Sequence, residues 1–148
     1  MNMETRKIVE INEDKCNGCG ICVEACAEGA IQIINGKAQF LKGAELLIAA
    51  DCTPVAYPFF QHLIKNKVVL IGCPKFDDIQ RYIQKFVAIF QKAEVKKITV
   101  AVMEVPCCQG LPVIVQKAMD ISGKSIPMET IVVSTKGKLM ISKADHLI

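Results

Sequence analysis

Residues 16–26 read CNGCGICVEAC, and this stretch decides how the first part of the chain must fold. Successive cysteines in it are separated by two, two and three residues: Cys16, Cys19, Cys22 and Cys26. Thiolates at such short spacing converge on one site only if the backbone curls tightly, and Gly18 and Gly20 permit that curl at little steric cost. The inward N–H groups of such a loop stabilise a bound anion. The stretch therefore predicts a metal-binding loop.

The spacing C-x2-C-x2-C-x3-C is typical of loops that hold a 4Fe-4S cluster through cysteine thiolates. Zinc sites more often pair two C-x2-C units or use histidine. Disulfides are rare in a reducing compartment. We therefore expect Cys16, Cys19, Cys22 and Cys26 to bind a 4Fe-4S cluster.

Residues 5–40 resemble the bacterial-type ferredoxin domain. The segment 26–31, CAEGAI, is similar to the Cys-Pro-x-Gly-Ala-Ile of that family, with Ala27 where proline is usual. The family usually pairs two cysteine motifs, and in two-cluster members the fourth cysteine of one motif ligates the other cluster. A second such motif is absent from this sequence. Either Cys26 completes the first cluster, or a distant cysteine does so and Cys26 serves another site.

The length and composition indicate a small domain joined to a medium one, since the chain has 148 residues and is 51% hydrophobic. Apolar stretches fall short of the roughly eighteen residues that cross a bilayer, and the charged start lacks the apolar centre of a signal peptide. We expect a cytoplasmic protein without a membrane partner. Eight cysteines in such a compartment indicate metal binding and suit an anaerobic setting.

The formal net charge of +3 is small and scattered, tryptophan is absent and aromatics make up 5% of the chain, so nucleic-acid binding is not expected. Lys92, Lys96 and Lys97 form the densest basic patch, which fits a solvated helix end or the docking of an acidic redox partner protein. The oligomeric state stays open, with a homodimer among the alternatives.

Two domains are expected, at residues 1–42 and 43–148. In the first, residues 6–11 and 30–34 predict short strands around the cysteine loop, and Asn35-Gly36 predicts a hairpin turn into residues 37–40. The second alternates apolar strands with amphipathic helices, the pattern of an α/β fold.

The α/β domain is expected to hold a four-stranded, mainly parallel sheet with helices on both faces. The expected strands are 46–50, 68–71, 98–103 and 130–134, and the expected helices are 54–65, 77–92 and 112–122. Pro54 and Pro112 suit the first turn of a helix, Asp77 or Asp78 can cap one, and Gly123 can end one.

The other four cysteines follow three of these strands: Cys52 the first, Cys73 the second, and Cys107 and Cys108 the third. In open parallel sheets ligands bind outside the carboxyl ends of the strands. Four thiols at that edge could provide all the ligands of a second iron–sulfur cluster. Lys75, next to Cys73-Pro74, is a cation that would raise the reduction potential of such a cluster.

Two other interpretations of these four cysteines stay open. They can be small core residues, or Cys107 and Cys108 can be a redox-active thiol pair. Residues 44–139 also resemble the carboxyl-terminal part of a group of uncharacterised ferredoxin-like iron–sulfur proteins of anaerobes, which implies iron–sulfur binding and no particular reaction.

Electron transfer through the first cluster and a second site at the sheet edge is the function expected from these residues. The alternatives are an oxidoreductase that reduces a small substrate at the second cluster or at the Cys107–Cys108 pair, and a sensor of redox state or oxygen.

Overall fold

Strand β1 (Glu45–Ala50) lies inside a five-stranded sheet in the computed structural model, which describes residues 39–141. The strands follow the order β2-β1-β3-β4-β5, with β2 at Val68–Gly72, β3 at Lys97–Met103, β4 at Met128–Val133 and β5 at Leu139–Ile141. Pairing from β2 to β4 is parallel, and β5 runs antiparallel to β4. The cysteine run and the strands expected at 6–11 and 30–34 lie outside the described residues.

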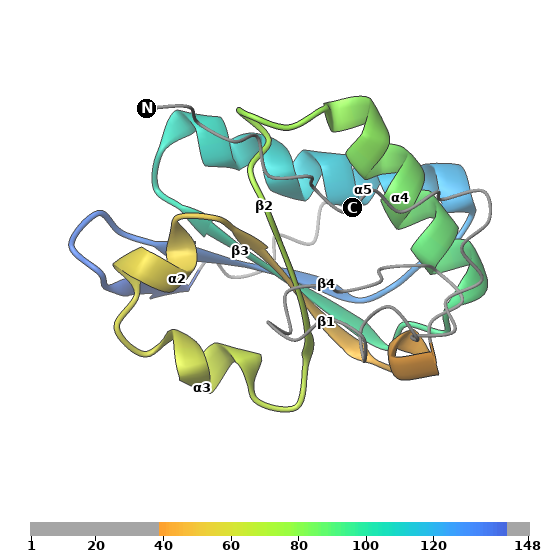
Figure 1. Cartoon of the computed structure of the whole chain (residues 1–148), viewed down its shortest axis with the longest axis horizontal. Helices are drawn as coiled ribbons and strands as arrows, with labels where there is room; N and C mark the ends of the chain where they lie inside the picture. Colours follow the sequence, from red (N-terminus) through yellow and green to blue (C-terminus); the bar gives the residue numbers. More distant parts are fainter. Residues whose placement is uncertain (1–38, 142–148) are drawn as a thin grey trace, which may run out of the picture.

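Both faces of the central strands are covered, which explains their continuous apolar sequences. Five of the six residues of β1 and six of the seven of β3 are buried. One face packs against α4 (Ile79–Lys92) and α5 (Gly110–Ser122), and the other packs against α3 (Phe60–Ile64). Helix α2 (Thr53–Ala56) contacts β1 and β3. Figure 1 shows these two helix layers on opposite sides of the sheet. The expected α/β fold with helices on both faces is confirmed.

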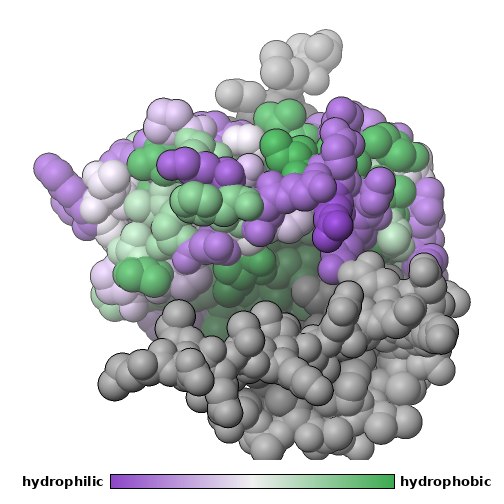
Figure 2. Space-filling model, turned by 45° about the horizontal axis from the view of Figure 1, so that its top comes forward, coloured by the Kyte–Doolittle hydropathy of each residue, from purple (hydrophilic) through white to green (hydrophobic). Residues whose placement is uncertain are grey.

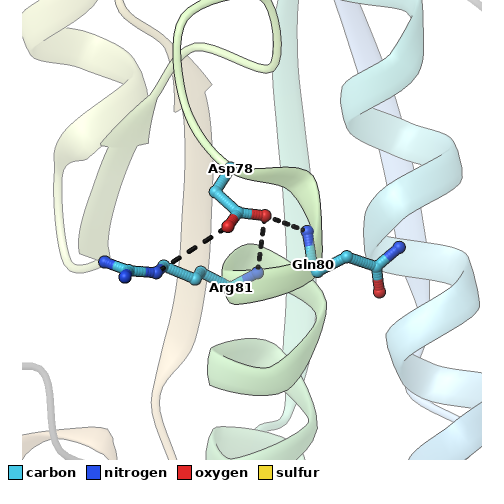
Figure 3. Close-up of polar contacts among 3 residues, drawn as sticks. All are labelled: Asp78, Gln80 and Arg81. Carbon is cyan, nitrogen blue, oxygen red and sulfur yellow. Dashed lines mark hydrogen bonds and ion pairs between the residues drawn. The ribbon is translucent and has the colours of Figure 1, made fainter.

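The long helices end where the sequence predicts, and each begins two residues from its expected start, α4 at Ile79 and α5 at Gly110. In α4 the buried residues Ile83, Phe86, Ile89 and Phe90 recur at helical spacing. Asp78 caps this helix: its carboxylate accepts hydrogen bonds from the backbone N–H groups of Gln80 at 2.8 Å and Arg81 at 3.4 Å (Figure 3). Gly123 ends α5 in the left-handed conformation with φ of 67°.

The single helix expected over 54–65 is wrong in detail. The chain forms α2 and α3 instead, separated by residues 57–59. Pro58 explains the break, because proline has no N–H to donate and pushes the preceding residue, here Tyr57, into the extended conformation. The expected hairpin would place residues 37–40 in a strand. This prediction is wrong for its last residues, because Gln39–Leu41 form the short 3-10 helix η1. Leu41 is fully buried in the core, which turns the chain inward at this point.

The fifth strand was not expected from the sequence. The turn between β4 and β5 is held from the end of β3, where the carboxylate of Glu104 accepts hydrogen bonds from the N–H of Thr135 at 2.7 Å and its hydroxyl at 2.8 Å. Gly137 takes a positive φ of 71°, and a Cβ there would lie 2.7 Å from the carbonyl oxygen of Ala56. The hairpin therefore closes against α2.

The surface over α4 and α5 is mixed. Figure 2, in which the top of Figure 1 comes forward, shows hydrophilic side chains spread over this face with apolar ones between them. Within residues 39–141, no helix combines the length and the apolar composition that crossing a bilayer requires.

Replacing Asp78 by alanine should lower the free energy of unfolding by about 1 kcal/mol, because two N–H groups at the start of α4 lose their acceptor. Urea denaturation measures this change. Arg81→Ala is the matched control, since its ion pair with Asp78 is long, at 3.7 Å, and exposed; it should change stability by no more than about 0.5 kcal/mol. Equal losses in the two variants would contradict the capping role.

Candidate thiol site at the carboxyl ends of the strands

The strand order has a topological switch point at the carboxyl ends of β1 and β3. The chain passes from β1 to β2 on one side and reaches β3 on the other side of β1. The connections that follow β1 and β3 therefore depart over opposite faces of the sheet, and ligands of open α/β sheets usually bind at such a point. Cys52 follows β1 directly, and Cys107 and Cys108 lie in the 3-10 helix η2 (Pro106–Gln109) after β3.

Two of the expected cysteines meet at this switch point. The Sγ atoms of Cys52 and Cys108 are 3.8 Å apart, although the residues are 56 positions apart in the chain. Cys52 is exposed, whereas Cys108 is 2% exposed and belongs to the main hydrophobic core. One thiol of the pair is open to solvent, and the other is covered by protein.

The backbone of η2 produces this burial. The N–H of Cys108 donates to the carbonyl oxygen of Val105 at 3.1 Å, and the side-chain amide of Gln109 donates to the carbonyl oxygen of Met103 at 3.4 Å. A 3-10 helix has three residues per turn, so consecutive side chains point about 120° apart. Cys108 therefore faces the core, while Cys107 is exposed.

Burial also controls the protonation of Cys108. Loss of hydration raises the pKa of its thiol to about 12; a hydrogen bond with the backbone of Met103 opposes the rise, and the contact with Cys52 adds to it. At neutral pH, Cys108 is a neutral thiol.

Cys73 is held in a turn at the end of β2. Its N–H donates to the carboxylate of Asp77 at 3.1 Å, and its carbonyl oxygen accepts from the N–H of Asp77 at 3.0 Å. The hydroxyl of Tyr82 donates to the same carboxylate. The Tyr82 hydrogen bond, followed by that from Cys73, lowers the pKa of Asp77, while burial and the contact with Asp77 raise the pKa of Tyr82.

Gly72 allows Tyr82 to reach this turn. A Cβ built at Gly72 would overlap the hydroxyl oxygen of Tyr82, so only glycine leaves space for the ring. Tyr82 was missed from the sequence, and the glycine immediately before Cys73 was the signal that could have indicated a close neighbour.

The loops after β2 and β3 lie side by side. A Cβ built at Gly110 would be 3.9 Å from the Cβ of Pro74, which follows Cys73. The full set of four thiols is nevertheless not gathered: within residues 39–141, no three histidine, cysteine, aspartate or glutamate side chains lie close enough to hold a metal ion. The structure brings together Cys52 and Cys108 and places Cys73 and Cys107 on the adjoining loops.

Lys75, the cation expected near the site, lies over an aromatic ring. Its ammonium nitrogen is 5.3 Å from the centroid of the Phe76 ring, which is itself 81% exposed. This contact holds the charge on the loop that carries Cys73.

Comparisons with known proteins divide the chain into two matched regions. Residues 38–148 match the family described as Rossmann-like domain, and residues 8–31 match the family described as 4Fe-4S binding domain. The second match contains Cys16, Cys19, Cys22 and Cys26, which lie outside the described residues. The match to 4Fe-4S binding domains supports at least one 4Fe-4S cluster in this protein.

A relative in Archaeoglobus fulgidus, named as an uncharacterized protein, is 35% identical over 107 residues, which cover 72% of this chain and 76% of the relative. No solved structure matches the chain.

Gly72→Ala should lower the free energy of unfolding by about 1–3 kcal/mol, because the added methyl group displaces the Tyr82 ring. Removing the ring should relieve the clash, so Gly72→Ala should cost much less in a Tyr82→Ala background. Chemical denaturation of the wild type, both single variants and the double variant measures this coupling. Strictly additive losses would show that the two residues do not conflict.

In reduced, iron-free protein at pH 8, iodoacetamide should alkylate Cys52 and Cys107 and spare Cys108. Burial blocks access to Cys108, and a thiol with a pKa of about 12 contains little thiolate at this pH. The thiolate of Cys108 increases only as the pH rises toward 12. Peptide mass mapping over time checks the order, with urea-unfolded protein as the control. Equal rates for Cys52 and Cys108 in the folded protein would contradict the assignment.

Proposed function

The chain belongs to the Rossmann-like domain family through residues 38–148. We propose that this protein is an iron–sulfur electron-transfer protein. The observation that carries the proposal is the match of residues 8–31 to 4Fe-4S binding domains, which contains the complete C-x2-C-x2-C-x3-C spacing. A 4Fe-4S cluster supplies one-electron transfer when bound. Cys16, Cys19, Cys22 and Cys26 are its proposed ligands.

A second iron–sulfur cluster at the sheet edge is the finer part of the proposal. Its ligands would be the thiolates of Cys52, Cys73, Cys107 and Cys108, a donor set that suits iron. Three observations support it: the four residues follow three neighbouring strands, Cys52 and Cys108 are in contact, and the loop of Cys73 lies against that of Cys107. Cys73 and Cys107 would have to move toward the pair as iron binds.

Hydrogen bonds and burial around these residues would tune such a site. Cys108 lies in an apolar environment that excludes water, and Asp77 and Tyr82 fix the turn of Cys73. The proposed division of the chain into residues 1–42 and 43–148 separates this site from the first one.

A redox partner protein is part of the same proposal. Exposed apolar side chains follow each cysteine loop: Val55 is 89% exposed, Phe76 81% and Val113 66%. Apolar surface around a redox site suits the docking of a protein. We also propose a cytoplasmic location, an anaerobic setting and no nucleic-acid or membrane partner. A homodimer is an alternative assembly.

Reduction of a small substrate is the second candidate, and the thiol contact between Cys52 and Cys108 favours it. A sensor of redox state or oxygen is the remaining alternative.

Anaerobically purified protein should contain about eight irons and eight acid-labile sulfides per chain, falling to about four of each when Cys52, Cys73, Cys107 and Cys108 are replaced together by serine. Metal and sulfide analysis measures both. About six irons in the wild type would indicate a two-iron second centre. About four in both proteins would overturn the second cluster and leave the first.

The control for the first cluster is Cys19→Ala. This variant should lose the visible absorption and electron paramagnetic resonance signals of the cluster at residues 16–26 and keep the iron bound at the sheet edge. An unchanged spectrum would overturn the electron-transfer proposal, because it would remove the ligand assignment on which it depends.

A further inference from the structure

The contact between Cys52 and Cys108 has the geometry of a reduced thiol pair. Their sulfurs are 3.8 Å apart, and a disulfide bond of about 2.05 Å would require the sulfurs to approach by a little under 2 Å. Cys52 is exposed and Cys108 is buried, so the movement is expected from the Cys52 side chain. The β1 and β3 ends that carry the two residues already belong to one sheet.

We propose that Cys52 and Cys108 interconvert between two thiols and an intramolecular disulfide, and that the disulfide closes the sheet-edge site to iron. The second half of this inference rests on the proposed second cluster, whereas the disulfide itself does not. Thiolates, not disulfide sulfurs, bind metals. Oxidation of the pair would therefore remove two of the four proposed ligands at once.

The alternative pairings of the described cysteines are disfavoured. Cys107 and Cys108 follow one another in η2, where consecutive side chains diverge by about 120°, and one is exposed while the other is buried. Cys73 lies on a separate loop, in the turn after β2 whose backbone is hydrogen-bonded to Asp77. Among residues 39–141, Cys52 and Cys108 are the two cysteines whose sulfurs are in contact, and this contact crosses between two loops.

The difference in exposure gives the two thiols separate roles in exchange with a small disulfide, RSSR. The exposed Cys52 thiolate attacks one sulfur of RSSR, which breaks the S–S bond, forms the mixed disulfide Cys52–S–R and releases RS⁻, which takes a proton from solvent. Cys108 then loses its proton and attacks Cys52 Sγ, releasing the second RS⁻, which is protonated in turn. The two cysteine thiols are oxidised by two electrons, and RSSR is reduced to two RSH. An external dithiol reverses the reaction.

The disulfide would also join two loops that are far apart in the chain. The disulfide would connect the loop after β1 to η2 after β3, across 56 residues of chain. A covalent link over so long a segment restricts the unfolded chain and is expected to raise the midpoint of thermal unfolding. The redox state of the pair would thus control both metal access and stability at one position.

Iron-free full-length protein, equilibrated with mixtures of oxidised and reduced glutathione, tests the disulfide. Alkylation followed by peptide mass mapping should show Cys52 and Cys108 losing their free thiols together, with one cross-linked peptide that joins them, and a dithiol should restore both. Cys73→Ser and Cys107→Ser are matched controls that keep the pair and should form the same link. Cys52→Ser should leave Cys108 as a free thiol.

A cross-link between Cys107 and Cys108, a link through Cys73, or glutathione retained on Cys52 without a link to Cys108 would overturn the inference. Because the link is mapped in the wild type, it does not depend on the folding of a Cys108 variant.

Iron reconstitution separates this inference from the proposed cluster. The reduced protein should take up about twice the iron of the protein oxidised at the pair, when the first site is loaded in both. Equal iron in both, together with a mapped Cys52–Cys108 link, would overturn the closure of the site and the second cluster but leave the disulfide standing. A second cluster in the reduced protein without any link after oxidation would overturn the disulfide and leave the cluster.

Discussion

Parallel pairing of β1 with both β2 and β3 is the constraint on which the arrangement of this molecule depends. Parallel strands bring their carboxyl ends to one edge, so residues that follow three different strands become neighbours there. Because β1 lies between β2 and β3, the topological switch point lies directly after β1. Cys52 and Cys108 meet at 3.8 Å for this reason, although they are 56 positions apart in the chain. An antiparallel arrangement of the same strands would have sent their cysteines to opposite edges.

The local structure of each loop then gives the thiols different chemical character. A 3-10 turn after β3 directs Cys108 into the core and leaves its neighbour Cys107 exposed. Burial favours the neutral form of a thiol, and the raised pKa of Cys108 follows from that. Cys52, by contrast, meets solvent at the edge of the sheet. The two thiols in contact therefore differ in accessibility, which is the condition for one to react before the other.

The loop after β2 is fixed by a different means. Asp77 accepts hydrogen bonds from Cys73 and Tyr82 at once, and the absence of a side chain at Gly72 makes room for the ring. These contacts hold the Cys73 turn, which lies next to the helix cap provided by Asp78. The two adjacent aspartates thus perform separate tasks: Asp78 begins α4, and Asp77 organises the turn that precedes it.

The sequence by itself determined the α/β class, the four parallel strands, the caps of α4 and α5, and the cysteine run that marks the 4Fe-4S domain, because periodicity, capping residues and ligand spacing are local properties. Only the tertiary structure decided that Pro58 divides one expected helix into two, that β5 pairs with β4, and that Cys108 contacts Cys52 while Cys73 and Cys107 remain on adjoining loops. A position at the end of a strand predicts the edge at which a side chain lies. Its direction and burial depend on the loop conformation and on packing against residues far away in the chain, and neither is encoded in local spacing.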